Sequence, residues 1–311
     1  MKIIRDFNDI DYKFEKPVLT IGKFDGVHLG HLGLIGKVLE RASAFKGTAA
    51  ALTFEPHPKK ILLPQERIEL ITTPGQKREL LEKAGLEILF VQKFSSGFSI
   101  RGPEEFVKDV LVGKIGIHTL VLGTDFSFGR SAIGDHKLMK KFGEDFGFEV
   151  ALVPPVVYGK RQVSSTHIRD LIKMGKMKNV ANFLGRFYFV DGKVIRGEGR
   201  GREMHVPTAN ILAENELIPP QGVYATYLET EGKRYDSVTN IGVRPTFGGS
   251  YLSIESNLME VEMDLYGKYV RLHFVQRMRD ERRFDSVNLL RIQIRKDIRR
   301  ALKILYENAL Q

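Results

Sequence analysis

Gly22-Lys-Phe-Asp-Gly-Val-His-Leu-Gly-His31 follows a short apolar run and precedes an amphipathic stretch, residues 31–45. A glycine-containing turn between a strand and a helix is where backbone amides and the helix dipole favour a phosphate group. His28 and His31 are three residues apart, so both would lie on one side of the first helical turn and could donate hydrogen bonds to phosphates. A histidine pair alone is also typical of a metal site or of two structural histidines, but the flanking glycines favour the phosphate interpretation.

The first half of the chain alternates apolar runs with amphipathic stretches, which predicts a parallel sheet with crossover helices. The expected strands are Val18–Gly22, Ala49–Phe54, Ile88–Val91, Thr119–Gly123 and Glu149–Val153. The expected helices are His31–Phe45, Pro74–Lys83, Pro103–Leu111 and Gly134–Phe146, with another after Ser165. A polar, basic stretch over 175–186 indicates a boundary, so we expect domains over 1–185 and 186–311.

After residue 186 the pattern changes to short strands broken by Gly, Pro and Asn turns, which predicts a small closed barrel. The expected strands include Tyr188–Ile195, Gly222–Glu229, Tyr235–Ile241 and Tyr269–Val275. A final helix is expected after Ser286, because apolar residues recur on one face from Val287 to Leu305. Its other face is basic, and we interpret it as a solvated surface.

The composition is that of a globular protein, with 42% hydrophobic and 28% charged residues. Its 311 residues favour two domains, and the absence of cysteine excludes disulfides, thiolate metal sites and a cysteine nucleophile. No run approaches the roughly 18 apolar residues of a membrane helix, and no signal-peptide core opens the chain, so we expect a cytoplasmic protein without membrane partners. The net charge of +10 suits polyanionic small molecules and nucleic acids alike.

Three further segments of the first half lie at predicted strand ends, where open α/β sheets bind ligands. They are Thr53-Phe-Glu-Pro-His-Pro58, Gly123-Thr-Asp-Phe-Ser-Phe-Gly129 and Val163-Ser-Ser-Thr-His-Ile-Arg169. The last would place its hydroxyls at a helix start with Arg169 one turn later, either a second clamp on a triphosphate or an ordinary cap. Asp125 either faces a ligand or makes an Asx turn.

In the second half a glycine-rich turn, Gly192-Lys-Val-Ile-Arg-Gly-Glu-Gly-Arg-Gly-Arg202, leads into Pro207-Thr-Ala-Asn210. Glycine-rich loops cradle phosphates, and Thr208 and Asn210 offer neutral oxygens suited to Mg²⁺ and its waters. The segment is neither a Walker P-loop nor a dinucleotide fingerprint. Taken alone, it is more typical of hairpin turns.

The four segments of the first half, in this order, resemble the FMN adenylyltransferase module of bacterial bifunctional riboflavin kinase/FAD synthetases, with His28-Leu-Gly-His31 as its HxGH element. Asn240-Ile-Gly-Val-Arg-Pro-Thr-Phe247, Ile254-Glu255, Asp264-Leu-Tyr-Gly267 and residues 279–286 resemble the riboflavin kinase domain. The likeness covers nearly the whole chain. It implies an α/β fold, with a Rossmann-like nucleotidyltransferase domain of parallel strands and crossover helices before a small closed β-barrel kinase domain with a C-terminal helix.

The resemblance also implies conversion of riboflavin to FMN and of FMN to FAD, with ATP as co-substrate and Mg²⁺ as cofactor. His28 and His31 would contact the ATP phosphates, and Glu255, otherwise an ordinary surface carboxylate, would accept the proton of the riboflavin 5′-hydroxyl. The other nucleotide-binding candidates are Gly22, Phe24, Asp25, Gly26, Ser164, Ser165, Thr166, Arg169, Gly197, Gly201, Arg202, Thr208 and Asn210, the last two also as metal ligands. The flavin-binding candidates are Asp125, Phe128, Asn240, Arg244 and Arg279.

Three positions depart from what many members of that family carry. Ser127 replaces a basic residue, His205 replaces a glycine and Asn257 replaces a histidine. The first concerns the flavin side of the adenylylation site. The other two concern the efficiency of the kinase step more than its identity.

Two alternatives stay open. The barrel could be an inactive flavin-binding module beside an active adenylyltransferase. The charge also fits a basic RNA-binding protein built on a nucleotide-binding fold, although no basic run interleaves with aromatic residues for base stacking. We therefore expect small-molecule partners and no nucleic acid, and the oligomeric state stays open, a homo-oligomer included.

Overall fold

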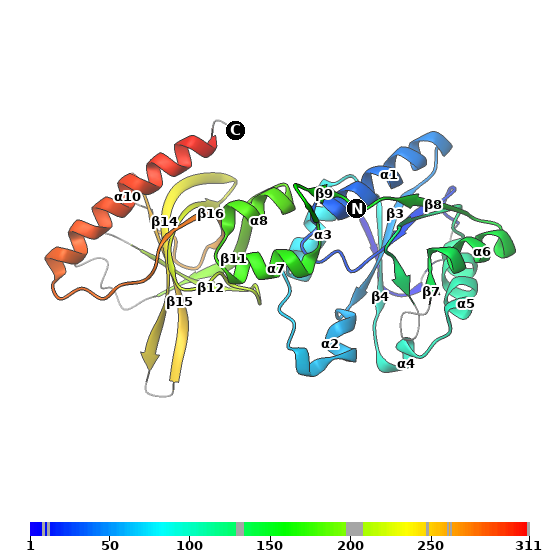
Figure 1. The fold of residues 1–311 in the computed structure, drawn as a ribbon, viewed down its shortest axis with the longest axis horizontal. Coiled ribbons are helices and arrows are strands. Elements are labelled where there is room, and N and C mark those ends of the chain that lie inside the picture. The colour runs from blue at the N-terminus through cyan, green and yellow to red at the C-terminus, as the bar shows by residue number, and fades with distance from the viewer. Residues whose placement is uncertain are drawn as a thin grey trace. The chain divides into compact units, whose positions relative to one another are not determined.

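The computed structural model describes residues 1–7, 10, 13–128, 134–196, 208–246, 249–259, 261 and 263–309 (Figure 1). Its tertiary contacts divide the chain into two compact units, Met1–Ser164 and Ser165–Gln311. The first contains a parallel sheet with helices and the second a closed barrel, so the predicted fold class is confirmed. The domain boundary expected after residue 185 stays a prediction.

The first unit alternates strands and helices along the chain. Its elements are β1 (Lys2–Ile4), β2 (Val18–Ile21), α1 (Leu29–Phe45), β3 (Ala49–Glu55), α2 (Pro58–Leu62), η2 (Pro64–Glu66), α3 (Pro74–Lys83), β4 (Ile88–Lys93), α4 (Ser96–Ser99), α5 (Pro103–Phe106), η3 (Val107–Ile115), β5 (Thr119–Gly123), β6 (Ser127–Phe128), β7 (Gly134–Asp135), α6 (His136–Phe146), β8 (Glu149–Val153), β9 (Val157–Tyr158) and β10 (Arg161–Gln162).

Six strands of the described chain form one parallel sheet in the order β1-β4-β3-β2-β5-β8. Successive residues of a strand point to opposite faces. Leu19 and Ala50 belong to a buried cluster with residues of η3 and α6, whereas Val18 and Ala51 belong to another with residues of α1. Because both faces are covered, the strands read in the sequence as nearly continuous apolar runs.

Two helices begin at residues other than those expected. α1 begins at Leu29, earlier than predicted, because His28 caps it. The helix expected from Gly134 begins at His136, because the Asp135 carboxylate accepts hydrogen bonds from the amides of its first turn. Cap side chains, more than apolar spacing, therefore determine where these helices start.

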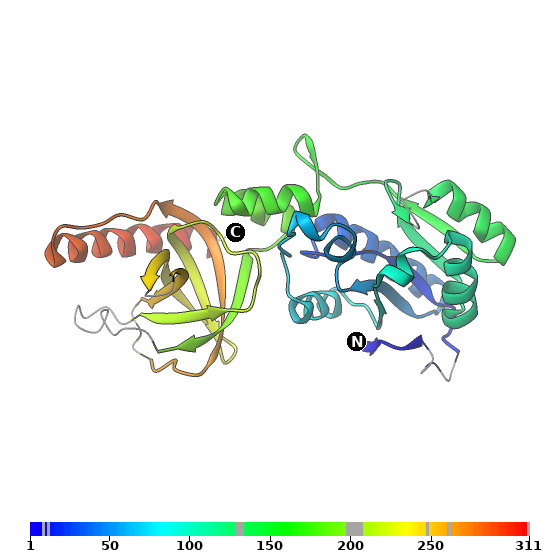
Figure 2. The same ribbon diagram turned by 90° about the horizontal axis from the view of Figure 1, so that it is seen from below.

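The second unit begins with two helices and continues into the barrel. Its elements are α7 (Ser165–Lys173), α8 (Met177–Leu184), β11 (Tyr188–Ile195), β12 (Ala209–Ala213), β13 (Gly222–Thr230), β14 (Lys233–Thr246), β15 (Gly249–Leu258), β16 (Tyr269–Arg279) and α10 (Val287–Ala309). The strands close in the order β11-β12-β15-β14-β13-β16 with antiparallel neighbours, and Figure 2 shows them curving round with α10 beside them. Of these strands, β12 and β15 were not indicated by the sequence pattern.

The inside of the barrel contains a chain of buried hydroxyls. Thr226 Oγ1 lies 2.8 Å from Ser237 Oγ and 2.7 Å from Thr239 Oγ1, and Thr239 Oγ1 donates to Ser256 Oγ at 3.0 Å. All four side chains are completely buried. Each hydroxyl therefore finds a partner on a neighbouring strand, as buried polar groups require.

The outer face of β13 packs under α10. Val223, Ala225 and Tyr227 alternate along this strand and share a buried cluster with Ile304 and Leu305 of the helix. The Tyr227 hydroxyl also donates a hydrogen bond to the Leu305 carbonyl at 3.0 Å. α10 therefore identifies which side chains of the neighbouring strands point out of the barrel.

None of the described helices combines the length and apolar character needed to cross a membrane.

Candidate functional site

The order in which successive strands are added to the parallel sheet reverses at β2. β3 and β4 lie on one side of this strand, whereas β5 and β8 lie on the other. In open α/β sheets the ligand crevice lies at the carboxyl ends of the strands at such a point. The residues that follow β2 lead to His28, and the residues that follow β5 include Asp125, so two of the predicted motifs lie at this edge.

His28 and His31 form a reciprocal cap at the start of α1. The Nδ1 atom of each imidazole accepts a hydrogen bond from the backbone amide of the other residue, both at 3.3 Å. The two rings stack with centroids 3.6 Å apart and planes 13° apart. Because Nδ1 is an acceptor in both rings, the neutral imidazoles carry their hydrogen on Nε2, which makes each Nε2 a donor. The pair therefore presents two N–H donors from one helix start.

The glycine turn before His28 is lined by the protein interior. Phe24 is fully buried in the core, and its ring lies 5.2 Å from the His31 ring. A Cβ on Gly22 would lie 2.9 Å from the Phe24 ring, and Gly26 has φ +86°. Gly22 thus leaves space for the buried Phe24 ring, and Gly26 allows the left-handed backbone of the turn. The Phe24 ring packs against the His31 ring.

Asp25 is also buried and faces another loop. Its side chain is 3% exposed, and Oδ1 accepts hydrogen bonds from the amides of Ile71 at 2.9 Å and Thr72 at 3.2 Å. This carboxylate connects the glycine turn to the residues before α3. The sequence pattern gave no indication of Thr72, because its only signal is one hydroxyl in a loop.

Lys77, a buried lysine of α3, lies beside the end of β3. Lys77 Nζ is 3.4 Å from both Glu55 Oε1 and Thr53 Oγ1, and only 8% of Lys77 is exposed. Burial lowers the pKa of Lys77, and the Glu55 carboxylate opposes that shift. Sequence reasoning singled out the segment containing Thr53 and Glu55 but missed Lys77, which reads as one more charge on an exposed helix.

Asp125 makes a defined contact across the sheet edge. Its Oδ2 accepts a hydrogen bond from Gln162 Nε2 at 2.7 Å, and a turn closes around it through the Phe126 amide and the Gly123 carbonyl at 3.1 Å. The carboxylate is exposed, as is the neighbouring Ser127. The side chain of Phe128 lies outside the described part of the structure.

The third segment runs from β10 into α7. The Val163 carbonyl oxygen lies 3.5 Å from where a Cβ on Gly30 would stand, so this segment passes beside the histidine loop. Ser164, Ser165 and Arg169 are half-buried and Thr166 is exposed, and α7 begins at Ser165.

In the barrel, three candidate side chains occupy one row across neighbouring strands. Asn210 of β12 pairs with Glu255 of β15, which pairs with Asn240 of β14. Directly opposed residues of antiparallel strands point to the same face. The next residue of the row is Val223, whose side chain packs under α10, so the row lies on the outer face. All three polar side chains are half-buried.

Three neighbours extend this row. Ser253 Oγ donates to Glu255 Oε1 at 3.3 Å, and Asn257 is buried on the same face. Glu281, in the segment after β16, brings Oε1 to 3.5 Å from Asn240 Nδ2. A Cβ on Gly242 would lie 2.3 Å from the same Glu281 oxygen, so this carboxylate lies directly over the backbone of β14. Sequence reasoning did not identify Glu281, although its segment was part of the likeness.

Arg279 is paired with α10. Its Nε and Nη2 donate to the carboxylate of Asp297 at 3.1 and 2.7 Å, and its Nη1 donates to the Asp280 carbonyl at 2.8 Å. The two side chains are 14% and 7% exposed. This buried ion pair fixes the end of β16 to the helix.

Several candidates lie outside the described residues. They are Gly197, Gly201, Arg202 and His205, together with the side chain of Arg244. Thr208 is half-buried directly before β12, close in sequence to Asn210. In the part of the chain that the structure describes, no three His, Asp or Glu side chains form a metal-binding group. The hydroxyl and amide oxygens of Thr208 and Asn210 fit Mg²⁺, which prefers oxygen ligands and keeps several waters.

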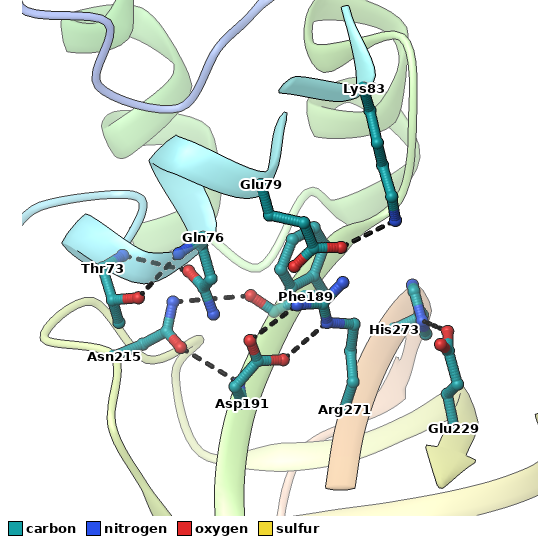
Figure 3. A network of polar contacts seen from close by, with 10 residues as sticks. All are labelled: Thr73, Gln76, Glu79, Lys83, Phe189, Asp191, Asn215, Glu229, Arg271 and His273. Atoms are coloured by element: carbon teal, nitrogen blue, oxygen red, sulfur yellow. Dashed lines mark hydrogen bonds and ion pairs between the residues drawn. The ribbon is translucent and has the colours of Figure 1, made fainter. Parts of the chain in front are cut away.

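A separate polar network covers another part of the barrel's outer face (Figure 3). Arg271 donates to both oxygens of Asp191 at 2.6 and 2.8 Å, and its guanidinium lies 4.0 Å from the centroid of the Phe189 ring. His273 Nε2 lies 2.9 Å from Glu229 Oε2. Burial lowers the pKa of His273, and the Glu229 carboxylate opposes that shift.

The chain matches two family models in sequence order. A model described as FAD synthetase matches residues 11–167, and one described as riboflavin kinase matches residues 184–305. The first match contains the histidine pair and Asp125. The second contains the row formed by Asn210, Glu255 and Asn240.

Curated relatives extend over nearly the whole chain. Proteins named bifunctional riboflavin kinase/FMN adenylyltransferase are 35% identical in Bacillus subtilis, over 93% of this chain and 92% of the relative, and 31% identical in Escherichia coli K12, over 96% of each. A crystal structure from Streptococcus pneumoniae, described as a macrolide-efflux protein, is similar at a TM-score of 0.88 and 31% identity, covering 96% of this chain and 97% of the other.

Proposed function

Because the chain belongs to the bifunctional riboflavin kinase/FMN adenylyltransferase family, we propose that it phosphorylates riboflavin to FMN in its barrel and adenylylates FMN to FAD in its α/β domain. ATP is the co-substrate of both steps. The observation that carries the proposal is that one chain contains both constellations, the capped histidine pair at the sheet edge and the polar row on the barrel.

In the adenylylation step, an oxygen of the FMN phosphate attacks the α-phosphorus of ATP, and the bond to the departing pyrophosphate breaks. Negative charge on the phosphate oxygens must be stabilised as this happens. The Nε2–H groups of His28 and His31 are donors held rigid by their caps, so they supply this stabilisation without rearrangement. No covalent intermediate on the protein is needed.

The remaining residues of this site are assigned by the family likeness and by sequence position. Ser164, Ser165, Thr166 and Arg169 are assigned to a second set of phosphate contacts, and the likeness of their segment to the family supports this assignment. Asp125 and Phe128 border the flavin, because they follow β5 at the same edge of the sheet.

In the kinase step, the riboflavin 5′-hydroxyl attacks the γ-phosphorus of ATP and ADP leaves. Glu255 accepts the proton of that hydroxyl, and its carboxylate is half-exposed and oriented by Ser253. Thr208 and Asn210 would bind Mg²⁺, which neutralises phosphate charge when it is bound. Asn240 and Arg244 lie on β14, whose pairing with β15 brings Asn240 opposite Glu255, and we assign both to the riboflavin side.

We assign the adenylyltransferase to residues 1–185 and the kinase to residues 186–311. The start of the riboflavin kinase match at residue 184 supports this boundary. The compact units divide earlier, between Ser164 and Ser165, because α7 and α8 pack with the barrel unit.

The test is a flavin conversion assay. Purified protein is incubated with riboflavin, ATP and MgCl₂, and the flavins are separated by chromatography. We expect His28→Ala to stop the series at FMN and Glu255→Ala to stop it at riboflavin. Because the two sites are separate, FMN supplied to Glu255→Ala should still become FAD.

Matched controls come from the same domains. His118 lies before β5, at the opposite edge of the sheet from His28, and Glu231 lies in the exposed turn between β13 and β14. His118→Ala and Glu231→Ala should convert riboflavin to FAD like the wild type. A chain that makes FAD from FMN but no FMN from riboflavin would support the alternative of an inactive flavin-binding barrel.

A further inference from the structure

The backbone directly before the histidine pair is unusual. Its φ angle is +50° at Phe24, +86° at Gly26 and +37° at Val27. Left-handed backbone is rare for residues other than glycine and rarer still for a β-branched residue. Such a conformation persists only where surrounding groups fix it. The residues that fix this turn therefore determine where His28 stands.

One set of contacts comes from the residues before α3. Oδ1 of Asp25 accepts from the amides of Ile71 and Thr72 at 2.9 and 3.2 Å and lies 3.4 Å from the Thr72 hydroxyl. The amide of Gly26 donates to the same hydroxyl at 3.1 Å. Asp25, Ile71 and Thr72 are all buried, at 3%, 0% and 6% exposure. The turn is thus bonded through both a side chain and its backbone.

A second contact comes from β3. The fully buried Thr53 hydroxyl donates to the Lys23 carbonyl at 3.3 Å, and Lys77 Nζ lies 3.4 Å from that hydroxyl. The turn is therefore fixed at its start and at its centre by parts of the chain distant in sequence. Asp25 receives three donors on a single oxygen.

We propose that Asp25 is a positioning residue for adenylyl transfer, acting with the Thr72 hydroxyl to hold residues 23–27 in the conformation that places the two imidazoles. The inference rests on the proposed adenylyltransferase activity. It assigns the Asp25 carboxylate to the protein interior and gives it no contact with the nucleotide. A shift of about 1 Å in the catalytic groups lowers a rate by about 100-fold.

The geometry separates this role from a direct role in binding. The amides of Ile71 and Thr72 and the Thr72 hydroxyl all meet Oδ1, so the amide oxygen of an asparagine can accept the same hydrogen bonds. A carboxylate that instead bound Mg-ATP would lose its charge in Asp25→Asn as completely as in Asp25→Ala. The two substitutions therefore differ only if positioning is the role.

The experiment measures FAD formation from FMN and ATP in the full-length chain. We expect Asp25→Ala to lower kcat by about 100-fold with little change in the KM for FMN, because substrate still binds while the imidazoles are displaced. Asp25→Asn should recover to within about tenfold of the wild type. Thr72→Val should lower kcat by about tenfold, and Thr72→Ser should restore it, since only the hydroxyl matters.

Thr73 offers the matched control. It is the next residue, but its hydroxyl accepts from the Gln76 amide at 3.2 Å and caps α3 instead of the turn (Figure 3). Thr73→Ala should lower the melting temperature and leave kcat unchanged. Conversion of riboflavin to FMN by every variant reports on the barrel and should stay at the wild-type rate.

Two results would overturn the proposal: wild-type kcat in Asp25→Ala, or equal loss in Asp25→Asn and Asp25→Ala with a raised KM for ATP. If Asp25→Ala does not fold, the comparison of Thr72→Val with Thr72→Ser tests the proposal instead. Equal kcat values for these two variants would contradict the positioning role. A wild-type chain that makes no FAD would instead contradict the proposed function, before any variant is compared.

Discussion

The two candidate sites are built in opposite ways. The histidine pair lies within one helical turn, and its partners for capping are each other. The barrel row draws one residue from each of three strands, and only the pairing of β12, β15 and β14 brings Asn210, Glu255 and Asn240 together. The first site is a local structure that tertiary contacts support. The second exists only once the barrel has closed.

This difference predicts different weaknesses. Apart from the contacts that fix its turn, a local site should tolerate changes elsewhere in the fold but lose its chemistry through one side chain. A site built by strand pairing should depend on whatever fixes the strands. The following substitutions test this contrast.

His28→Asn separates capping from chemistry at the local site. Asparagine is among the best N-cap residues, so α1 should keep its start and the melting temperature should change little. The Nε2 donor is lost, and removal of one such donor lowers a rate by about 10²–10³-fold, which is the decrease we expect in FAD formation. A loss of activity matched by loss of the helix cap, detected as a large drop in melting temperature, would contradict this separation.

Asp297→Ala tests the dependence of the barrel site on α10. Arg279, 14% exposed, would lose its carboxylate partner, and because this guanidinium is not fully buried we expect the lower end of the range for a broken buried pair, about 3 kcal/mol of unfolding free energy. Urea unfolding measures the loss. The exposed pair of Lys83 and Glu79 is the control, and Glu79→Ala should cost less than about 1 kcal/mol.

Glu255→Gln tests the chemistry of the barrel row without changing its shape. A general base contributes about 10²–10⁴-fold, so FMN formation should fall by about 100-fold or more. FAD formation from added FMN should not change. Equal FMN formation by the variant and the wild type would remove Glu255 from the reaction.

The smallest effect concerns pH. Burial lowers the pKa of His273 below the ordinary histidine value of 6.5, so the native state resists protonation. Between the lowered pKa and 6.5 the unfolded state binds more protons, and stability from this group, complete above pH 6.5, is lost as the pH falls through the folded pKa. The difference in urea midpoint between wild type and His273→Gln should therefore shrink in acid. A difference that is constant from pH 8 to pH 5 would contradict this.

The contrast also explains what could be predicted from the sequence. His28 and His31 stand three residues apart beside glycines, so spacing alone indicated a shared side of the helix, and the parallel sheet followed from the apolar runs. The partner of Asp25 was hidden because it lies 46 residues away in a loop without a motif. Lys77 was hidden because a lysine in a charged helix reads as solvated, and only the packed structure buries it.

In the barrel, the individual candidates came from the family likeness, but their arrangement depends on register. Neither β12 nor β15 was expected. Glu281 follows β16 and meets Asn240 only across the closed sheet. The periodicity of a single sequence indicates where strands are, but not which strands pair with each other.

The buried hydroxyl chain inside the barrel has a consequence for how this family could diversify. A slip of β15 by one residue would turn Glu255 inward and Ser256 outward, because side chains alternate between faces. The Thr239 hydroxyl then loses its Ser256 partner, and the Glu255 carboxylate enters the buried interior of the barrel. Barrels with this shifted strand pairing are therefore unfavourable. Alignment is thus specified by residues inside the barrel, which leaves the outer positions free to acquire a new specificity by mutation while the strands keep their pairing.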